Sequence, residues 1–171
     1  MTTHPDYIRA VPSLERHAAE MRDMVPHYRT LQGLAHGCRY VVEFGVRTGV
    51  STWALLEALP PDGLLLSWDI EEPPVPDQVR DDPRWRFHKG DSLTATVEQV
   101  PGLVFIDTSH TYRQTMDELR LCASWGAPLI VLHDWNLPGV ADAVTEFCDR
   151  TGYYIDGVQQ SQWGMVWVRK P

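Results

Sequence analysis

The sequence predicts an α/β fold: a doubly wound, mainly parallel sheet with helices on both faces and an antiparallel hairpin at its C-terminal end. Short, nearly continuous apolar runs alternate along the chain with amphipathic segments, and such runs are typical of strands buried on both faces. The last two apolar runs lie too close in sequence for a helical crossover, so we expect them to pair as a hairpin.

Residues 1–37 are predicted to be an arm and helices that belong to the same domain and are able to cover a substrate. The first twelve residues hold two prolines and little periodicity. Ser13 is expected to begin a helix over 14–25, which Pro26 interrupts. Helical character resumes over 27–37 and ends at a glycine.

Residues 38–171 are predicted to form the sheet and its covering helices. Strands are expected at 39–45, 63–70, 84–91, 102–107 and 127–135, with the hairpin at 153–160 and 163–170. Helices are expected at 51–60, 111–125 and 139–152, with room for one helical turn in the proline-rich stretch 71–83 and a short helix or turn at 92–100.

Composition and charge exclude several classes of protein. The formal net charge of −8 argues against nucleic acid as a partner, because a phosphate backbone requires a basic face. No apolar run is long enough to span a bilayer, and the first residues lack the apolar core of a signal peptide, so a cytoplasmic protein without a membrane partner is expected. The cysteines, Cys38, Cys122 and Cys148, have no metal or disulfide spacing and are predicted to be free thiols.

Every strand of the predicted parallel set ends in an acid, a glycine or both. In open α/β sheets, ligands bind beyond the carboxyl ends of the strands, where the strand order reverses. Polar turns alone would explain one such strand end, but five in register indicate a site. The residues concerned are Glu43, Gly45, Gly49, Asp69, Gly90, Asp91, Ser92, Asp107, His110, His133 and Asp134.

The loop after the first strand indicates a ligand without phosphates. Gly45 and Gly49 lie four residues apart between a strand and a helix. This spacing lacks the central glycine that admits a pyrophosphate, and no Gly-Lys-Ser/Thr ending of a P-loop follows. A glycine pair is also compatible with an ordinary strand-to-helix turn, so the prediction needs the next strand as well.

The second and third strands suggest a nucleoside ligand. Asp69 lies about 20 residues beyond the glycines, where an acid can accept hydrogen bonds from both ribose hydroxyls. Ile70 is expected to pack on an adenine face, and Asp91 and Ser92 to meet the edge of the base. A nucleoside without phosphates, carrying a group beside the glycine loop, indicates S-adenosylmethionine (SAM).

Three segments, VVEFGVRTGVST, LVFIDTSHTYRQTMDEL and APLIVLHDW, resemble the class I SAM-dependent methyltransferases. The group that includes macrocin-type sugar O-methyltransferases and cephalosporin hydroxylase proteins is the most similar, over about residues 38–169. The resemblance implies a Rossmann-like methyltransferase domain over 38–171. It also implies cofactor contacts from Glu43, Gly45, Gly49, Ser51, Asp69, Ile70, Asp91 and Ser92.

The resemblance further implies a divalent metal, commonly magnesium, on Asp107 and Asp134 with His133 beside them, and His110 as general base. Chemistry supports this assignment, because metal coordination lowers the pKa of a hydroxyl and a nearby imidazole can then take its proton. His133 replaces a carboxylate of some relatives, and imidazole suits softer metals better than magnesium. His133 is therefore either a metal ligand or a residue that hydrogen-bonds to the backbone or to a ligand. Asn136 is a candidate for the oxygen ligand that the carboxylate of those relatives provides.

The leading hypothesis is a metal-assisted O-methyltransferase that acts on a small-molecule hydroxyl of a sugar or a natural product, with Asp107 and His110 as catalytic residues. The alternative is a non-catalytic accessory module that binds SAM or S-adenosylhomocysteine (SAH). A nicotinamide-dependent oxidoreductase is disfavoured by the glycine spacing. A homo-oligomer is left open, with Trp163 a candidate contact. His4, His17, His27, His36 and His88 show no ligand spacing and are predicted at the surface or on helix faces.

Overall fold

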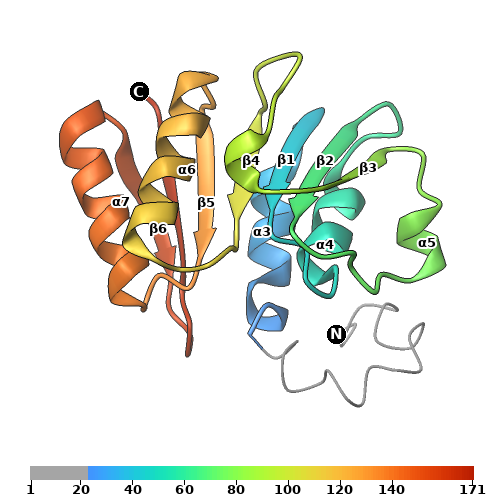
Figure 1. The fold of residues 1–171 in the computed structure, drawn as a ribbon, viewed down its shortest axis with the longest axis horizontal. Helices are drawn as coiled ribbons and strands as arrows, with labels where there is room; N and C mark the ends of the chain where they lie inside the picture. The colour runs from blue at the N-terminus through green and yellow to red at the C-terminus, as the bar shows by residue number, and fades with distance from the viewer. Residues whose placement is uncertain (1–22) are drawn as a thin grey trace.

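The computed structural model describes residues 23–171, and these form one seven-stranded sheet with the order β3-β2-β1-β4-β5-β7-β6 (Figure 1). The predictions for Ser13 and for most of the helix over 14–25 lie outside the described residues. The strands are β1 (Tyr40–Phe44), β2 (Leu64–Asp69), β3 (Trp85–Lys89), β4 (Leu103–Ile106), β5 (Leu129–His133), β6 (Tyr154–Gln159) and β7 (Met165–Arg169).

The strand directions confirm the predicted fold class. β1 to β5 pair in parallel, whereas β7 pairs antiparallel with both β5 and β6, so the C-terminal hairpin forms one end of the sheet. β1 has β2 on one side and β4 on the other, and the strand order therefore reverses at β1. A crevice for a ligand is expected at this point, beyond the carboxyl ends of the strands.

Helices cover both faces of the sheet, as predicted. One face packs against α3 (Tyr28–Ala35), α4 (Val50–Ala58) and the single turn α5 (Asp77–Arg80), and the other against α6 (Tyr112–Ser124) and α7 (Pro138–Thr151). Alternate residues of each strand face opposite layers, so Val41 lies in the first core and Val42 in the second. Short 3₁₀ turns, η1 (Val25–His27) and η2 (Ser92–Thr94), complete the described elements.

The described residues contain neither a disulfide nor a membrane-spanning helix. Cys38, Cys122 and Cys148 are free thiols, as predicted, and Cys122 is fully buried. No helix within residues 23–171 is long and apolar enough to cross a membrane.

The chain that precedes α3 lies at the edge of the sheet where the parallel strands end. The guanidinium of Arg47, in the loop after β1, forms an ion pair with Asp23, with an N–O distance of 2.7 Å. Gln159 at the end of β6 donates a hydrogen bond to the carbonyl of Pro26. The stretch 23–27 is therefore attached to the loop after β1, in the middle of the sheet, and to β6, at one end of it.

The turn at Gly45 is shaped by contact between two strand ends. Gly45 has φ of +87°, and a Cβ atom there would overlap the backbone carbonyl of Asp107, at the end of β4. Its N–H donates to the carbonyl of Trp68 on β2, at 2.9 Å. The sequence led us to expect a ligand against this backbone, but the nearest neighbour of the glycine is the protein itself.

Replacing Gly45 with alanine is expected to destabilise the protein by about 3 kcal/mol or more, because the new methyl group adds a steric overlap to an unfavourable φ. Urea unfolding followed by circular dichroism measures the effect. Gly33→Ala is the matched control: it lies in α3 with open space around it and should raise stability by about 0.5 kcal/mol. Equal stabilities of the two variants would contradict this account of the turn.

Candidate cofactor pocket and catalytic cluster

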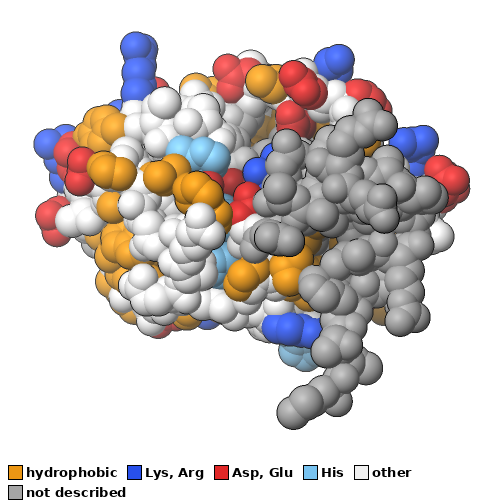
Figure 2. All heavy atoms as spheres, turned by 90° about the horizontal axis from the view of Figure 1, so that it is seen from below, with side chains coloured by type: hydrophobic (Ala, Val, Ile, Leu, Met, Phe, Trp, Pro, Cys, Tyr) orange, Lys and Arg blue, Asp and Glu red, His pale blue; other side chains and the backbone are white. Residues whose placement is uncertain are grey.

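A cavity of about 630 Å³ opens beyond the carboxyl ends of β1 to β4, at the point where the strand order reverses. This volume is typical of pockets for small molecules. The lining comes from four loops and from the first turn of α6: Gly45, Arg47, Thr48, Trp68, Asp69, Ile70, Glu71, Glu72, Pro73, Pro74, Gly90, Asp91, Ser92, Asp107, Thr108, Ser109 and Gln114. Figure 2 views the molecule from this edge and shows imidazole and carboxylate side chains gathered near the middle of the face.

Most residues predicted to bind the cofactor lie together in this cavity: Gly45, Asp69, Ile70, Asp91 and Ser92. Ile70 is 71% exposed, so a large apolar side chain stands at the cavity wall with little protein packed on it. Such a side chain is suited to cover the face of a planar base. The structure therefore brings these five predicted residues together around one cavity.

Asp69 has a structural task that its position in the sequence did not reveal. One carboxylate oxygen accepts hydrogen bonds from the backbone N–H groups of Val46 and Arg47, at 2.8 and 3.0 Å. The other oxygen accepts from the N–H of Glu71. Asp69 thus ties the glycine loop to the end of β2 while it also lines the cavity.

Glu43 lies behind the glycine loop and does not line the cavity. Its buried carboxylate accepts hydrogen bonds from the hydroxyls of Ser51, Thr52 and Ser67, at distances from 2.6 to 3.1 Å. Burial raises the pKa of Glu43 to about 7, although these hydroxyls oppose the shift. Gly49 and Ser51, also predicted to meet the cofactor, are likewise absent from the lining and form the start of α4.

A second buried acid, Glu118 on α6, supports the opposite wall of the cavity. Its carboxylate accepts hydrogen bonds from the side chains of Ser92, Thr108 and Gln114, at 2.5, 2.9 and 3.1 Å. All three donors line the cavity, and they come from three different segments. Sequence reasoning missed Glu118, although an acid on the buried face of an amphipathic helix was a usable signal.

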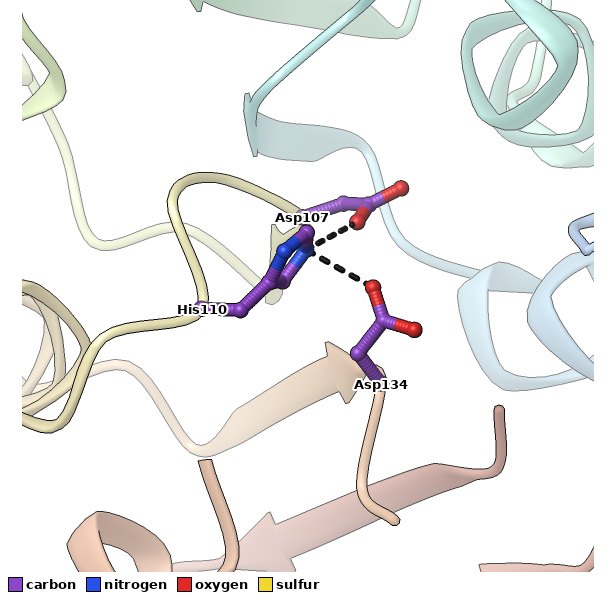
Figure 3. Close-up of side chains that lie close together, drawn as sticks. All are labelled: Asp107, His110 and Asp134. Atoms are coloured by element: carbon purple, nitrogen blue, oxygen red, sulfur yellow. Dashed lines mark hydrogen bonds and ion pairs between the residues drawn. The ribbon is translucent and has the colours of Figure 1, made fainter. Parts of the chain in front are cut away.

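Asp107, His110 and Asp134 form a compact cluster at one end of the cavity (Figure 3). Nε2 of His110 lies 3.0 Å from Oδ1 of Asp107 and 2.7 Å from Oδ2 of Asp134. Asp107 and His110 both belong to the loop between β4 and α6, and Asp134 follows β5. The structure thus brings together the three residues that the sequence predicted for catalysis and metal binding.

The backbone holds this cluster in an uncommon conformation. His110 and Asp134 have φ of +56° and +59°, in the left-handed region that residues other than glycine rarely adopt. Gly139, in the first turn of α7, packs on the His110 loop, and a Cβ atom there would lie 2.6 Å from the His110 carbonyl oxygen. Such strained positions concentrate at functional sites, because the surrounding packing must maintain them.

His133 lies fully buried behind the cluster. Its Nδ1 is 3.2 Å from Oδ2 of Asp134 and 3.5 Å from Oδ1 of Asp107, and neither ring nitrogen has a hydrogen-bond partner within the described residues. The ring of His27 packs edge-on against it, with 5.2 Å between ring centroids. Of the two positions predicted for His27, the surface or a helix face, the surface is wrong: this side chain of η1 is buried, and its Nε2 lies 2.8 Å from the Ser161 hydroxyl.

The two carboxylates control the protonation of both imidazoles. Burial alone would lower the pKa of His110 and of His133, but the neighbouring Asp107 and Asp134 raise these pKa values to about 9 and about 10. In return, the imidazoles hold the pKa of Asp107 well below its usual range despite burial. At neutral pH both imidazoles therefore carry a proton when the carboxylates are their only partners, and His110 must lose that proton before it can act as a base.

The cluster also has the composition of a site for a divalent cation. The donor atoms of Asp107, His110 and Asp134 lie within 4.8 Å of one another, and Nδ1 of His133 lies 3.2 Å from Oδ2 of Asp134. Asn136, the candidate for a further oxygen ligand, is attached to the hairpin by its amide nitrogen. Its amide donates to the carbonyls of Ser161 and Gln162 and thereby holds the turn between β6 and β7.

A family model described as a methyltransferase domain matches residues 42–135, more than half of the chain. The chain belongs to this methyltransferase family. The matched segment runs from the middle of β1 to just beyond β5, so it includes Glu43 and all four of Asp107, His110, His133 and Asp134. The methyltransferase family and the Rossmann-like fold agree with the prediction from the sequence. No curated protein matches the sequence.

Solved structures share the fold of this methyltransferase. The O-methyltransferase TomG from Streptomyces achromogenes, in complex with SAM, is 17% identical with a TM-score of 0.67, over 94% of this chain and 90% of its own. An O-methyltransferase from Bacillus cereus, in complex with SAH, is 13% identical with a TM-score of 0.75, over 100% and 93%. The N-methyltransferase NodS from Bradyrhizobium japonicum is 14% identical with a TM-score of 0.64, over 85% and 95%. The fold alone therefore does not decide which atom of an acceptor is methylated.

Removing the carboxylate of Glu118 is expected to weaken SAH binding about tenfold, because three lining side chains lose their common acceptor. Isothermal titration calorimetry of Glu118→Ala with SAH measures the loss. Glu118→Gln keeps the size and one acceptor oxygen, and it should retain most of the affinity. An unchanged affinity in the alanine variant would show that the cavity wall does not depend on this residue.

The raised pKa of Glu43 makes stability depend on pH. The folded protein keeps this proton up to about pH 7, whereas the unfolded chain releases it near pH 4.5, so stability falls as pH rises through this window. The slope is up to about 1.4 kcal/mol per pH unit. In urea unfolding between pH 5 and pH 8, the free energy of unfolding of Glu43→Gln should lack this part of the pH dependence. The control Glu98→Gln, at an exposed position, should keep it. Parallel pH profiles of Glu43→Gln and wild type would contradict the prediction.

Proposed function

We propose that this methyltransferase transfers the methyl group of SAM to a hydroxyl of a small molecule, a sugar or a natural product, with the assistance of a divalent metal. One observation carries the proposal. Asp107 belongs both to the cavity lining and to the cluster with His110 and Asp134, so the cluster adjoins the pocket that we assign to the cofactor.

The chemistry of the cavity favours SAM over a dinucleotide. Five carboxylates line it, and the one basic residue of the lining, Arg47, is ion-paired with Asp23. An acidic pocket disfavours the pyrophosphate of a nicotinamide cofactor and favours the positively charged sulfonium of SAM. Ile70 is suited to the adenine, and Asp69 retains lone pairs for the ribose.

The cluster supports transfer to an oxygen atom. Asp107 and Asp134 would hold the cation, with imidazole donors beside them, and a bound divalent cation lowers the pKa of an acceptor hydroxyl. His110, once neutral, would accept the proton of that hydroxyl at Nε2. The carboxylates and the left-handed turn orient this ring. The remaining requirement is an in-line arrangement of oxygen, methyl group and sulfur, which the walls of the cavity would impose.

A non-catalytic module that only binds SAM or SAH is the second candidate. Such a module would need the cavity but not a strained cluster of two acids and an imidazole, and the cluster therefore favours the enzyme. The small-molecule class of the acceptor rests on the resemblance to sugar O-methyltransferases. It also rests on the solved structure of TomG, whose description places that enzyme in tomaymycin synthesis.

Two variants separate binding from catalysis. Ile70→Ala should weaken SAH binding about fivefold in calorimetric titration, because the adenine loses an apolar contact, whereas Val100→Ala, which is 59% exposed and outside the cavity, should not. Asp134→Ala leaves the cavity lining intact, so it should bind SAH within about twofold of wild type.

The same Asp134→Ala variant should lose methyl transfer by about a hundredfold or more. The assay is release of SAH from SAM in the presence of a panel of hydroxylated sugars and phenols. Transfer that survives in Asp134→Ala would exclude the cluster from catalysis. Failure of the wild-type protein to bind SAH would exclude the cofactor.

A further inference from the structure

We propose that Asp107, His110, His133 and Asp134 together bind a borderline first-row transition metal ion, such as Zn²⁺ or Co²⁺, and that the site selects against magnesium. The inference rests on the proposed function, which requires only a divalent cation, and it names the class of that cation. The resemblance to known methyltransferases led us to expect magnesium, but the donor set around these two carboxylates differs from the one that magnesium prefers.

Both imidazoles approach the same pair of carboxylate oxygens. Nε2 of His110 lies 3.0 and 2.7 Å from Oδ1 of Asp107 and Oδ2 of Asp134, and Nδ1 of His133 lies 3.5 and 3.2 Å from the same two oxygens. Around an ion with bonds of about 2.1 Å, adjacent ligands are separated by roughly 3.0 to 3.4 Å. The observed nitrogen–oxygen distances lie around this range and are compatible with nitrogen and oxygen ligands of one ion.

His133 provides an independent reason to place an ion here. Its side chain has no solvent exposure, and neither ring nitrogen has a hydrogen-bond partner within residues 23–171. The edge of the His27 ring closes the adjacent space. An unpartnered buried imidazole costs free energy, and coordination through Nδ1 would remove part of that cost.

The nitrogen donors that lie beside the two carboxylates are imidazoles. The amide nitrogen of Asn136 holds the turn between β6 and β7, and the hydroxyl of Thr108 donates to Glu118. Magnesium prefers six oxygen ligands and keeps its water, whereas zinc, cobalt, nickel and iron accept imidazole readily.

The site is closed on the side of the acids and more open at His110. The side chains of Asp107 and Asp134 are 12% and 9% exposed, against 31% for His110. A closed inner set of ligands with one accessible side is typical of catalytic metal sites, which leave a position for water or substrate. The acceptor oxygen would enter from this side, next to the cavity.

Metal titration of the untagged, chelator-treated protein tests the inference. Calorimetry with Co²⁺, Zn²⁺ and Mg²⁺, each alone, should show a single site that binds Co²⁺ and Zn²⁺ at least about tenfold more tightly than Mg²⁺. The visible absorption of the Co²⁺ form should report nitrogen ligands. Magnesium that binds as tightly as Co²⁺ would overturn the inference, and so would the absence of Co²⁺ and Zn²⁺ binding.

Variants of His133 identify the donors. His133→Ala should weaken Co²⁺ binding by about tenfold or more, whereas the exposed His36→Ala should not. His133→Asp restores a carboxylate at this position and should shift the preference toward Mg²⁺. Equal Co²⁺ affinity in wild type and His133→Ala would remove His133 from the ligand set and overturn the four-donor site.

Cofactor binding distinguishes a failure of this inference from a failure of the proposed function. Neither His133 nor His36 lines the cavity. All variants should therefore bind SAH with an affinity within about twofold of wild type. A protein that binds SAH and transfers methyl groups with Mg²⁺ alone would contradict the metal assignment and leave the methyltransferase intact. Loss of SAH binding in wild type would contradict the proposed function instead.

Discussion

The site depends on the close approach of two strand ends, at Gly45 after β1 and Asp107 after β4. Because Gly45 has no side chain, its backbone packs directly on the carbonyl of Asp107. This contact sets the position of the glycine loop, which forms one wall of the cavity, relative to the acid that the cavity shares with the catalytic cluster. A side chain at this position would separate the cofactor pocket from the groups that we propose act on the acceptor.

Buried and exposed acids have different roles around the cavity. Glu43 and Glu118 lie behind opposite walls, and each accepts hydrogen bonds from three side chains. Burial disfavours their ionised forms, and their role is to fix the walls. Asp69 and Asp91 face the cavity and are available to a ligand. The two buried carboxyl groups thus make the pocket rigid, and the acids that face the cavity make it acidic.

The cluster beyond the pocket is organised by strain and by charge. His110 and Asp134 both have a left-handed backbone conformation. Packing of α7 holds the backbone at His110, and a hydrogen bond within the loop after β5 holds it at Asp134. The register of β4 and β5, which pairs Ile106 with Leu132, brings Asp107 beside His133. Both imidazoles then share the same two carboxylates, and protons and metal ions would compete for these nitrogens.

The sequence by itself determined the fold class, the succession of strands and helices along the chain and the strand ends that carry the site. It could do so because buried parallel strands have a recognisable apolar pattern, and because their carboxyl ends must meet at one edge of the sheet. Asp107, His110 and Asp134 were predictable for this reason. Only the tertiary structure decided the roles of Glu118, His27 and His133. These depend on side-chain direction and on contacts between distant segments, such as the one between His27 and His133, 106 residues apart, which no local pattern encodes.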